Sequence, residues 1–169
     1  MLNQFPLTRW PLLMAAGSLM MLLGAWGFEY IGRYAPCALC YDQRYIHMAV
    51  IALGLASGAA LIVRPNLGRF APWALFVIAA ILLYSFGFAG WHAGIEYDWW
   101  DGPATCTTAG TVSVNTADLF AALDGEIPAV MCDEAAWTLL GISMAGYNAL
   151  ISLGMAGVSI FVGLQGLRK

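Results

Sequence analysis

Charged residues are scarce in this chain. They make up 10% of its 169 residues, whereas hydrophobic residues make up 61%. A soluble domain usually carries about 25% charged residues, so the shortage argues against an ordinary soluble domain and favours a membrane protein. The seven Lys and Arg residues also form no basic patch. That absence sets aside a nucleic-acid-binding function.

Long charge-free segments divide the chain. Four of them, at about residues 10–28, 45–63, 70–91 and 145–164, contain no Asp, Glu, Lys or Arg. Each can cross a hydrocarbon core of about 30 Å as a helix that rises 1.5 Å per residue. The first segment is longer than the apolar core of a signal peptide, and bulky residues occupy the place of a cleavage site. The sequence predicts an all-α membrane protein, a four-transmembrane-helix bundle that forms one integral membrane domain over residues 1–169.

The few charges are sorted between the connecting segments. Basic residues lie at both ends of the chain and in one short turn: Arg9, Arg64, Arg69, Arg168 and Lys169. All ten acids lie in the other two connections, at about residues 29–44 and 92–144. Because Lys and Arg favour the cytoplasmic side of a membrane, we expect both termini in the cytoplasm and these two loops on the outer face.

All four cysteines fall in the two outward loops: Cys37, Cys40, Cys106 and Cys132. An even number of cysteines on one side of a membrane suits disulfide chemistry in an oxidising compartment. Cys106 and Cys132 could also form a purely structural disulfide that clips the long loop.

Cys37 and Cys40 are separated by two residues and precede the second span. If the helix begins near Cys37, Cys40 lies in its first turn, where the positive helix end favours a thiolate. Arg44 follows four residues later on the same face and would favour the thiolate further. A static disulfide and half of a zinc site are the alternatives. Zinc is disfavoured, and no metal is expected, because Cys106 and Cys132 form no second close-spaced pair.

The two histidines permit several interpretations. His47 lies on one helix stripe with Cys40 and Arg44. It is either a proton donor to a bound oxidant, since imidazole titrates near neutral pH, or a hydrogen-bonded interfacial histidine. His47 and His92 at matched depth would also permit a haem with two axial imidazoles. The haem is disfavoured because it leaves the cysteine pairs unexplained.

Four motifs occur in order along the chain: Cys37-Ala38-Leu39-Cys40 with Gln43-Arg44 following, His92-Ala93-Gly94-Ile95-Glu96, Gly102-Pro103-Ala104-Thr105-Cys106, and Cys132-Asp133-Glu134-Ala135-Ala136-Trp137. Together with the four spans, they resemble the disulfide bond formation protein B (DsbB) family of bacterial inner-membrane quinone reductases. The likeness covers nearly the whole chain. It implies a multi-pass protein of the bacterial inner membrane whose active cysteines face the periplasm.

The resemblance implies a path for electrons. A reduced thioredoxin-like, DsbA-like dithiol oxidase of the periplasm gives electrons to the Cys106–Cys132 pair, which passes them to Cys37–Cys40 and on to membrane quinone (ubiquinone or menaquinone). By position, Cys106 forms the mixed disulfide with the partner and Cys132 exchanges with Cys37. Cys40 is then the thiolate beside the quinone ring, and Arg44 is the cation on the quinone side. The net reaction generates disulfide bonds.

Tyr97 departs from the family pattern. The best-studied members carry a histidine just after the glutamate that corresponds to Glu96, so no role of that histidine is carried over. A second redox interpretation is a vitamin-K-epoxide-reductase-like enzyme, in which the active dithiol tends to follow the loop cysteines. Here Cys37 and Cys40 precede the loop cysteines, which disfavours this interpretation. A third interpretation is a non-catalytic membrane subunit with structural disulfides.

Overall fold

The computed structural model describes residues 6–103 and 131–168. Four long helices dominate it: α1 (Trp10–Trp26), α2 (Ala38–Val63), α3 (Ala71–Glu96) and α5 (Met144–Leu167). Shorter elements join them: η2 (Leu7–Arg9), the π-helical turn η3 (Gly27–Ile31), η4 (Pro65–Phe70), β1 (Thr138–Leu139) and β2 (Ile142–Ser143).

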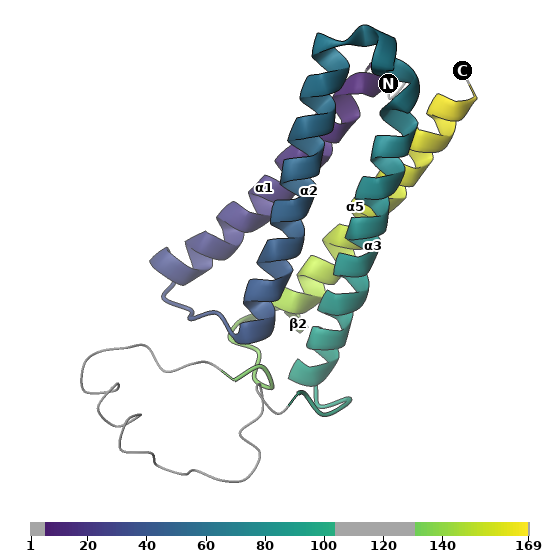
Figure 1. The fold of residues 1–169 in the computed structure, drawn as a ribbon. Helices are drawn as coiled ribbons and strands as arrows, with labels where there is room; N and C mark the ends of the chain where they lie inside the picture. The colour runs from purple at the N-terminus through teal and green to yellow at the C-terminus, as the bar shows by residue number, and fades with distance from the viewer. Residues whose placement is uncertain (1–5, 104–130, 169) are drawn as a thin grey trace.

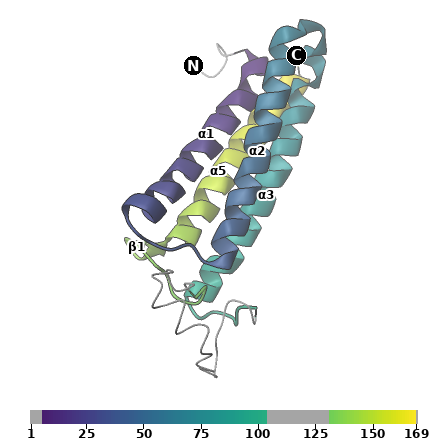
Figure 2. The same cartoon turned by 60° about the vertical axis from the view of Figure 1, so that its left-hand side comes forward.

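The four helices pack side by side as a bundle (Figures 1 and 2). The start of α1, the α2–α3 turn and the end of α5 lie at one end of the bundle, called the turn end here. The α1–α2 connection and the β1–β2 hairpin lie at the opposite end, the cysteine end. All four helices are long and apolar enough to cross a membrane. The predicted four-helix membrane bundle is therefore confirmed.

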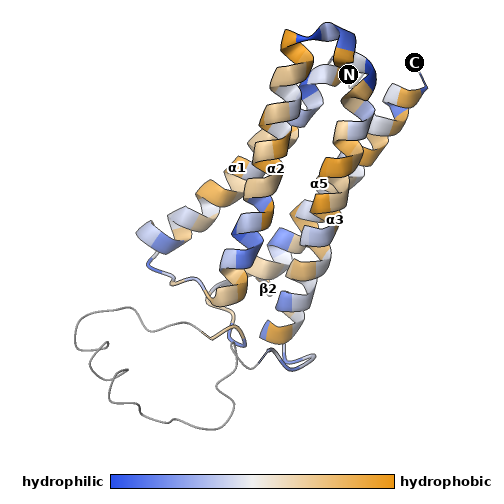
Figure 3. Ribbon diagram, viewed as in Figure 1, coloured by the Kyte–Doolittle hydropathy of each residue, from blue (hydrophilic) through white to orange (hydrophobic). Residues whose placement is uncertain are grey.

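The helices extend beyond the charge-free segments. α2 begins at Ala38 rather than near residue 45, so Cys40 and Arg44 lie on the helix. α3 likewise continues to Glu96 and carries His92. Figure 3 shows hydrophilic residues on α2 near the cysteine end. A charged residue marks the end of an apolar segment, but the helix can continue past it. It does so where the polar side chains have hydrogen-bond partners inside the bundle.

The turn end has an apolar core. Its fully or nearly fully buried members are Trp10, Met14, Val50, Leu75, Ile78, Leu82, Ala156 and Val162. Gly54 lets α1 and α2 approach closely. A Cβ atom at Gly54 would lie 2.6 Å from the carbonyl oxygen of Pro11 and 2.9 Å from the Cβ of Ala15. Only glycine leaves this contact free of a clash.

A two-residue hairpin precedes α5. β1 and β2 are antiparallel, with Leu139 opposite Ile142, and the turn residues Leu140 and Gly141 have positive φ angles of 53° and 77°. Positive φ at both central positions is the type I′ pattern that suits the twist of paired strands. The Tyr97 hydroxyl donates to the carbonyl of Gly141 (2.9 Å) and accepts from an adjacent backbone amide of β2 (2.8 Å). Tyr97 thus fastens the hairpin to the end of α3.

Candidate redox site

Cys37 is the N-cap of α2. Its backbone is extended (φ −76°, ψ 171°), and its Sγ accepts a hydrogen bond from the backbone N–H of Cys40 at 3.2 Å. Pro36 precedes it and lines the neighbouring cavity. A side chain that caps a helix satisfies one of the unpaired amides of the first turn. Cys40 therefore sits in that turn, as predicted for a helix that begins near Cys37.

The Cys37 and Cys40 thiols are both free. Cys37 is buried and Cys40 half-buried. Hydrogen bonding to the Cys40 side chain, and then burial, raise the pKa of the Cys37 thiol above its usual range. Cys37 therefore holds its proton more tightly than an ordinary thiol does.

Cys132 lies next to this pair. It is buried in one small cluster with Cys37, Leu39 and Ile95, against which Cys40 packs. Its own sulfur is bound in a disulfide. Cys106 lies outside the described residues, so its predicted pairing with Cys132 stays a prediction. The structure thus brings three of the four predicted cysteines together.

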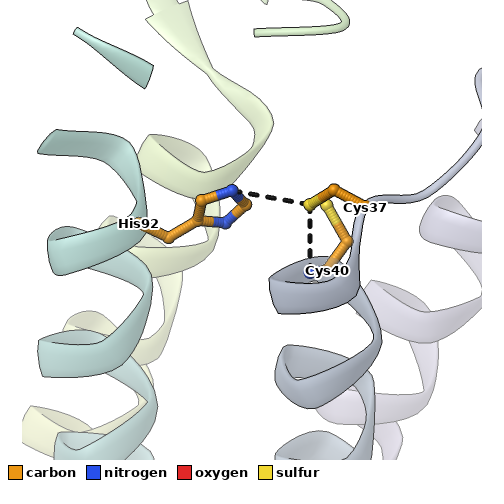
Figure 4. A group of neighbouring side chains, drawn as sticks. All are labelled: Cys37, Cys40 and His92. Carbon is orange, nitrogen blue, oxygen red and sulfur yellow. Dashed lines mark hydrogen bonds between the residues drawn. The ribbon is translucent and has the colours of Figure 1, made fainter. Parts of the chain in front are cut away.

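His92 reaches the pair from α3 (Figure 4). Its Nε2 lies 3.5 Å from the Sγ of Cys37, and its Nδ1 lies 2.6 Å from the Nε2 of Gln43. The donor atoms of Cys37, Cys40 and His92 all lie within 4.8 Å of one another. Among the described residues these three could hold a metal, but a structural zinc site is four-coordinate. The sequence alone suggested His92 as a partner of His47 in a haem site rather than as a neighbour of the dithiol.

Arg44 is partly buried in an ion pair with Glu29 of the η3 turn. One of its guanidinium nitrogens also lies 3.5 Å from the backbone oxygen of Ala25, and the guanidinium stands 5.2 Å from the ring centre of Tyr41. The pair fastens the end of α1 to the first turns of α2. Sequence reasoning missed Glu29 because nothing in the chain indicated how the two helices were rotated relative to each other.

His47 belongs to a buried hydrogen-bonded group. Its Nε2 lies 2.8 Å from the Oδ1 of Asn148, and its Nδ1 lies 3.3 Å from the Oγ of Ser18. The Nδ2 of Asn148 donates to the Oε1 of Gln43 at 2.5 Å. Both ring nitrogens of His47 are therefore occupied, which favours the hydrogen-bonded interpretation over the proton donor. Asn148 was not predicted, although it is the one amide side chain within the last charge-free segment.

A cavity of about 390 Å³ opens beside Cys40. Cys40, Arg44 and His47 line it from α2. Its other walls are mostly apolar and include Phe28 and Trp137, whose ring centres are 4.9 Å apart. Its size and apolar lining, with a few convergent polar groups, are typical of a small-molecule site.

Comparisons with known proteins identify the family. The model of the family described as "Disulfide bond formation protein DsbB" matches residues 7–162. An uncharacterized protein of Rickettsia prowazekii (strain Madrid E), RP370, is 28% identical over 152 residues, which cover 87% of this chain and 80% of the relative. No solved structure matches the chain. The chain belongs to the DsbB family, and it is a multi-pass membrane oxidoreductase of disulfide bond formation.

Proposed function

We propose that this protein re-oxidises a thioredoxin-like, DsbA-like dithiol oxidase of the periplasm and passes the electrons to quinone in the bacterial inner membrane. One observation carries the proposal. Cys40 lines a mostly apolar cavity, and its neighbour Cys37 is buried in one cluster with Cys132. The dithiol therefore adjoins both a sulfur that can deliver electrons and a space that can hold their acceptor.

The first exchange delivers electrons to the dithiol. After the partner's dithiol has reduced the disulfide that holds Cys132, the Cys132 thiolate attacks the Sγ of Cys37 in a Cys37–Cys40 disulfide. A bond forms between Cys132 and Cys37, the Cys37–Cys40 bond breaks, and its electron pair stays on Cys40. Arg44 and the positive end of α2 stabilise that charge at the cavity wall.

A second exchange completes the transfer. A thiolate, for which Cys106 is the candidate, attacks Cys132, and the electron pair of the Cys132–Cys37 bond stays on Cys37. The disulfide at Cys132 is restored, and the Cys37–Cys40 pair is left reduced. The cavity beside Cys40 fits a quinone ring in size and in its apolar lining. A bound quinone accepts the two electrons and two protons that return this pair to the disulfide.

The proposal is tested with purified protein, a reduced thioredoxin-like oxidase and a short-chain ubiquinone or menadione. The quinone absorbance should fall with one dithiol oxidised per quinone reduced. Cys40→Ser should abolish this activity while the protein still folds and inserts into the membrane. Met48→Leu, at an exposed position of α2, is the control and should keep full activity. Activity that persists in Cys40→Ser, or that is absent with both quinones, would refute the proposal.

A further inference from the structure

Two hydrogen-bond donors converge on the sulfur of Cys37. One is the backbone N–H of Cys40, at 3.2 Å, and the other is the imidazole of His92, whose Nε2 is 3.5 Å away (Figure 4). His92 is only 1% exposed, so water does not compete for its ring. Donors aimed at a buried sulfur stabilise negative charge there.

The amide of Gln43 decides which nitrogen of His92 carries the proton. The Oε1 of Gln43 accepts from Asn148, so its NH₂ group faces the Nδ1 of His92 at 2.6 Å. An NH₂ group can only donate, and Nδ1 must therefore be the unprotonated, accepting nitrogen. The proton of the neutral ring is then on Nε2, which faces Cys37.

Asn148 continues the same hydrogen-bonded chain. Its Oδ1 lies 2.8 Å from the Nε2 of His47 and 3.1 Å from the hydroxyl of Ser152. In this arrangement the tautomer of His92 belongs to a continuous buried chain that runs from His47 through the amides of Asn148 and Gln43.

Among the described residues, few hydrogen-bond acceptors lie near the proton on Nε2 of His92. The nearer carboxylate oxygen of Glu96 is 4.0 Å from Nε2, which is too far for a hydrogen bond. The backbone of Cys132 also interacts with the ring. Since Nδ1 is taken by Gln43, Nε2 is the ring nitrogen that faces the sulfur of Cys37. His92 is therefore close to both cysteines that exchange under the proposed function.

We propose that His92 acts as a neutral hydrogen-bond donor that stabilises negative charge on the Cys37 sulfur, with Gln43 as the positioning residue that fixes its tautomer. The inference rests on the proposed function in that Cys37 exchanges with Cys132. When the Cys37–Cys132 bond breaks, its electron pair stays on Cys37 while the attacking thiolate bonds to Cys132. The imidazole keeps its proton throughout, because Nδ1 remains the acceptor from Gln43.

The charge on Cys37 is expected only when Cys40 carries none. In the free dithiol, hydrogen bonding to the Cys40 side chain raises the pKa of Cys37, which disfavours charge on Cys37. When Cys40 has taken up a proton or is bound, that competitor is absent. The two donors then serve Cys37 alone.

The test needs neither quinone nor partner, so its failure is distinct from failure of the proposed function. Cys40→Ser, Cys106→Ser and Cys132→Ser together leave Cys37 as the one cysteine, and the backbone donor of position 40 is retained. In detergent with EDTA, thiolate absorbance at 240 nm is titrated from pH 5 to 11, and the titration of a cysteine-free chain is subtracted.

Three variants in this background separate the possible roles of His92. His92→Leu removes the donor and should raise the titration midpoint by about one pH unit, a tenfold weaker acid. His92→Gln places an uncharged N–H close to the original Nε2 and should stay within about 0.3 unit of the parent, a limit set well inside that tenfold step. Gln43→Leu keeps the ring but frees its tautomer, and it should fall between the two.

Two outcomes would overturn the proposal. Equal midpoints for the parent, His92→Leu and Gln43→Leu would show that His92 does not act on Cys37. A midpoint for His92→Gln as high as that for His92→Leu would show that a titrating imidazole, rather than a neutral donor, is required. If circular dichroism shows that His92→Leu does not fold, the midpoints of the parent, His92→Gln and Gln43→Leu still decide whether His92 acts on Cys37 as a neutral donor.

Discussion

The two ends of the helix bundle bury different kinds of side chain. The turn end encloses an apolar core that includes Leu75, Ile78 and Val162. The cysteine end instead buries polar side chains: Gln43, His47, His92, Ser143 and Asn148. A buried polar group costs free energy unless it is hydrogen-bonded, and apolar residues would fill the same space without that requirement. The turn end is thus packed for stability, whereas the cysteine end holds the polar groups that the proposed chemistry uses.

The largest expected effect on stability lies at the turn end. Leu75 is fully buried in the apolar core, and Leu75→Ala should lower the free energy of unfolding by about 2–4 kcal/mol through lost contacts and a cavity. Turnover per folded molecule should stay unchanged. Thermal unfolding in micelles and quinone reduction measure the two quantities. Val77→Ala, on an exposed face of the same helix, is the matched control with a small effect. A tenfold loss of turnover in Leu75→Ala would contradict the claim that packing at the turn end does not affect activity at the cysteine end.

An intermediate effect is expected at Arg44. Arg44→Gln removes the cation from the cavity wall and should slow quinone reduction roughly 10- to 100-fold, the usual range for a lost charge-assisted hydrogen bond. Arg44→Lys keeps the charge without the planar donor pair and should retain more activity. Arg64→Gln, at the exposed turn end, should leave turnover unchanged. Full activity in Arg44→Gln would mean that Arg44 only fastens α1 to α2 through Glu29.

The smallest expected effect concerns His47. His47→Leu leaves Asn148 and Ser18 without their ring partner and should lower stability by about 1 kcal/mol. The pH dependence of turnover should keep its shape, since both ring nitrogens are already bonded within the bundle. Quinone reduction measured between pH 5.5 and 8.5 checks this. A pH profile of turnover that flattens near neutral pH would instead indicate that His47 donates protons during quinone reduction.

The general architecture could be predicted from the sequence because lipid imposes a strong constraint on it. A charge-free segment of membrane length has few alternatives to a helix, and the Cys37–Cys40 spacing places both thiols at the start of one. The sequence left two starts open for α2, one near Cys37 from the cysteine motif and one near residue 45 from the loss of charge. The charged and polar residues before residue 45 favoured the later start, but their partners Glu29 and Asn148 lie on other elements.

The contacts between helices could not be predicted from the sequence. Nothing along the chain specifies the rotation of α3 that turns His92 toward Cys37, because that rotation depends on the packing of all four helices. The same limit applies to Gln43, which the sequence presents only as one residue of a motif. Its two hydrogen bonds come from α3 and α5.

The sulfur of Cys37 caps α2, so the proposed electron transfer and the stability of the helix are linked. An N-cap contributes about 1 kcal/mol to its helix, and more when the acceptor is charged. The coupling is reciprocal. A stable first turn of α2 favours the Cys37 thiolate, and the thiolate in turn stabilises that first turn. The stability of the first turn of α2 should therefore change during each redox cycle. Hydrogen exchange at the Cys40 amide, which the sulfur protects, would report the oxidation state of the protein.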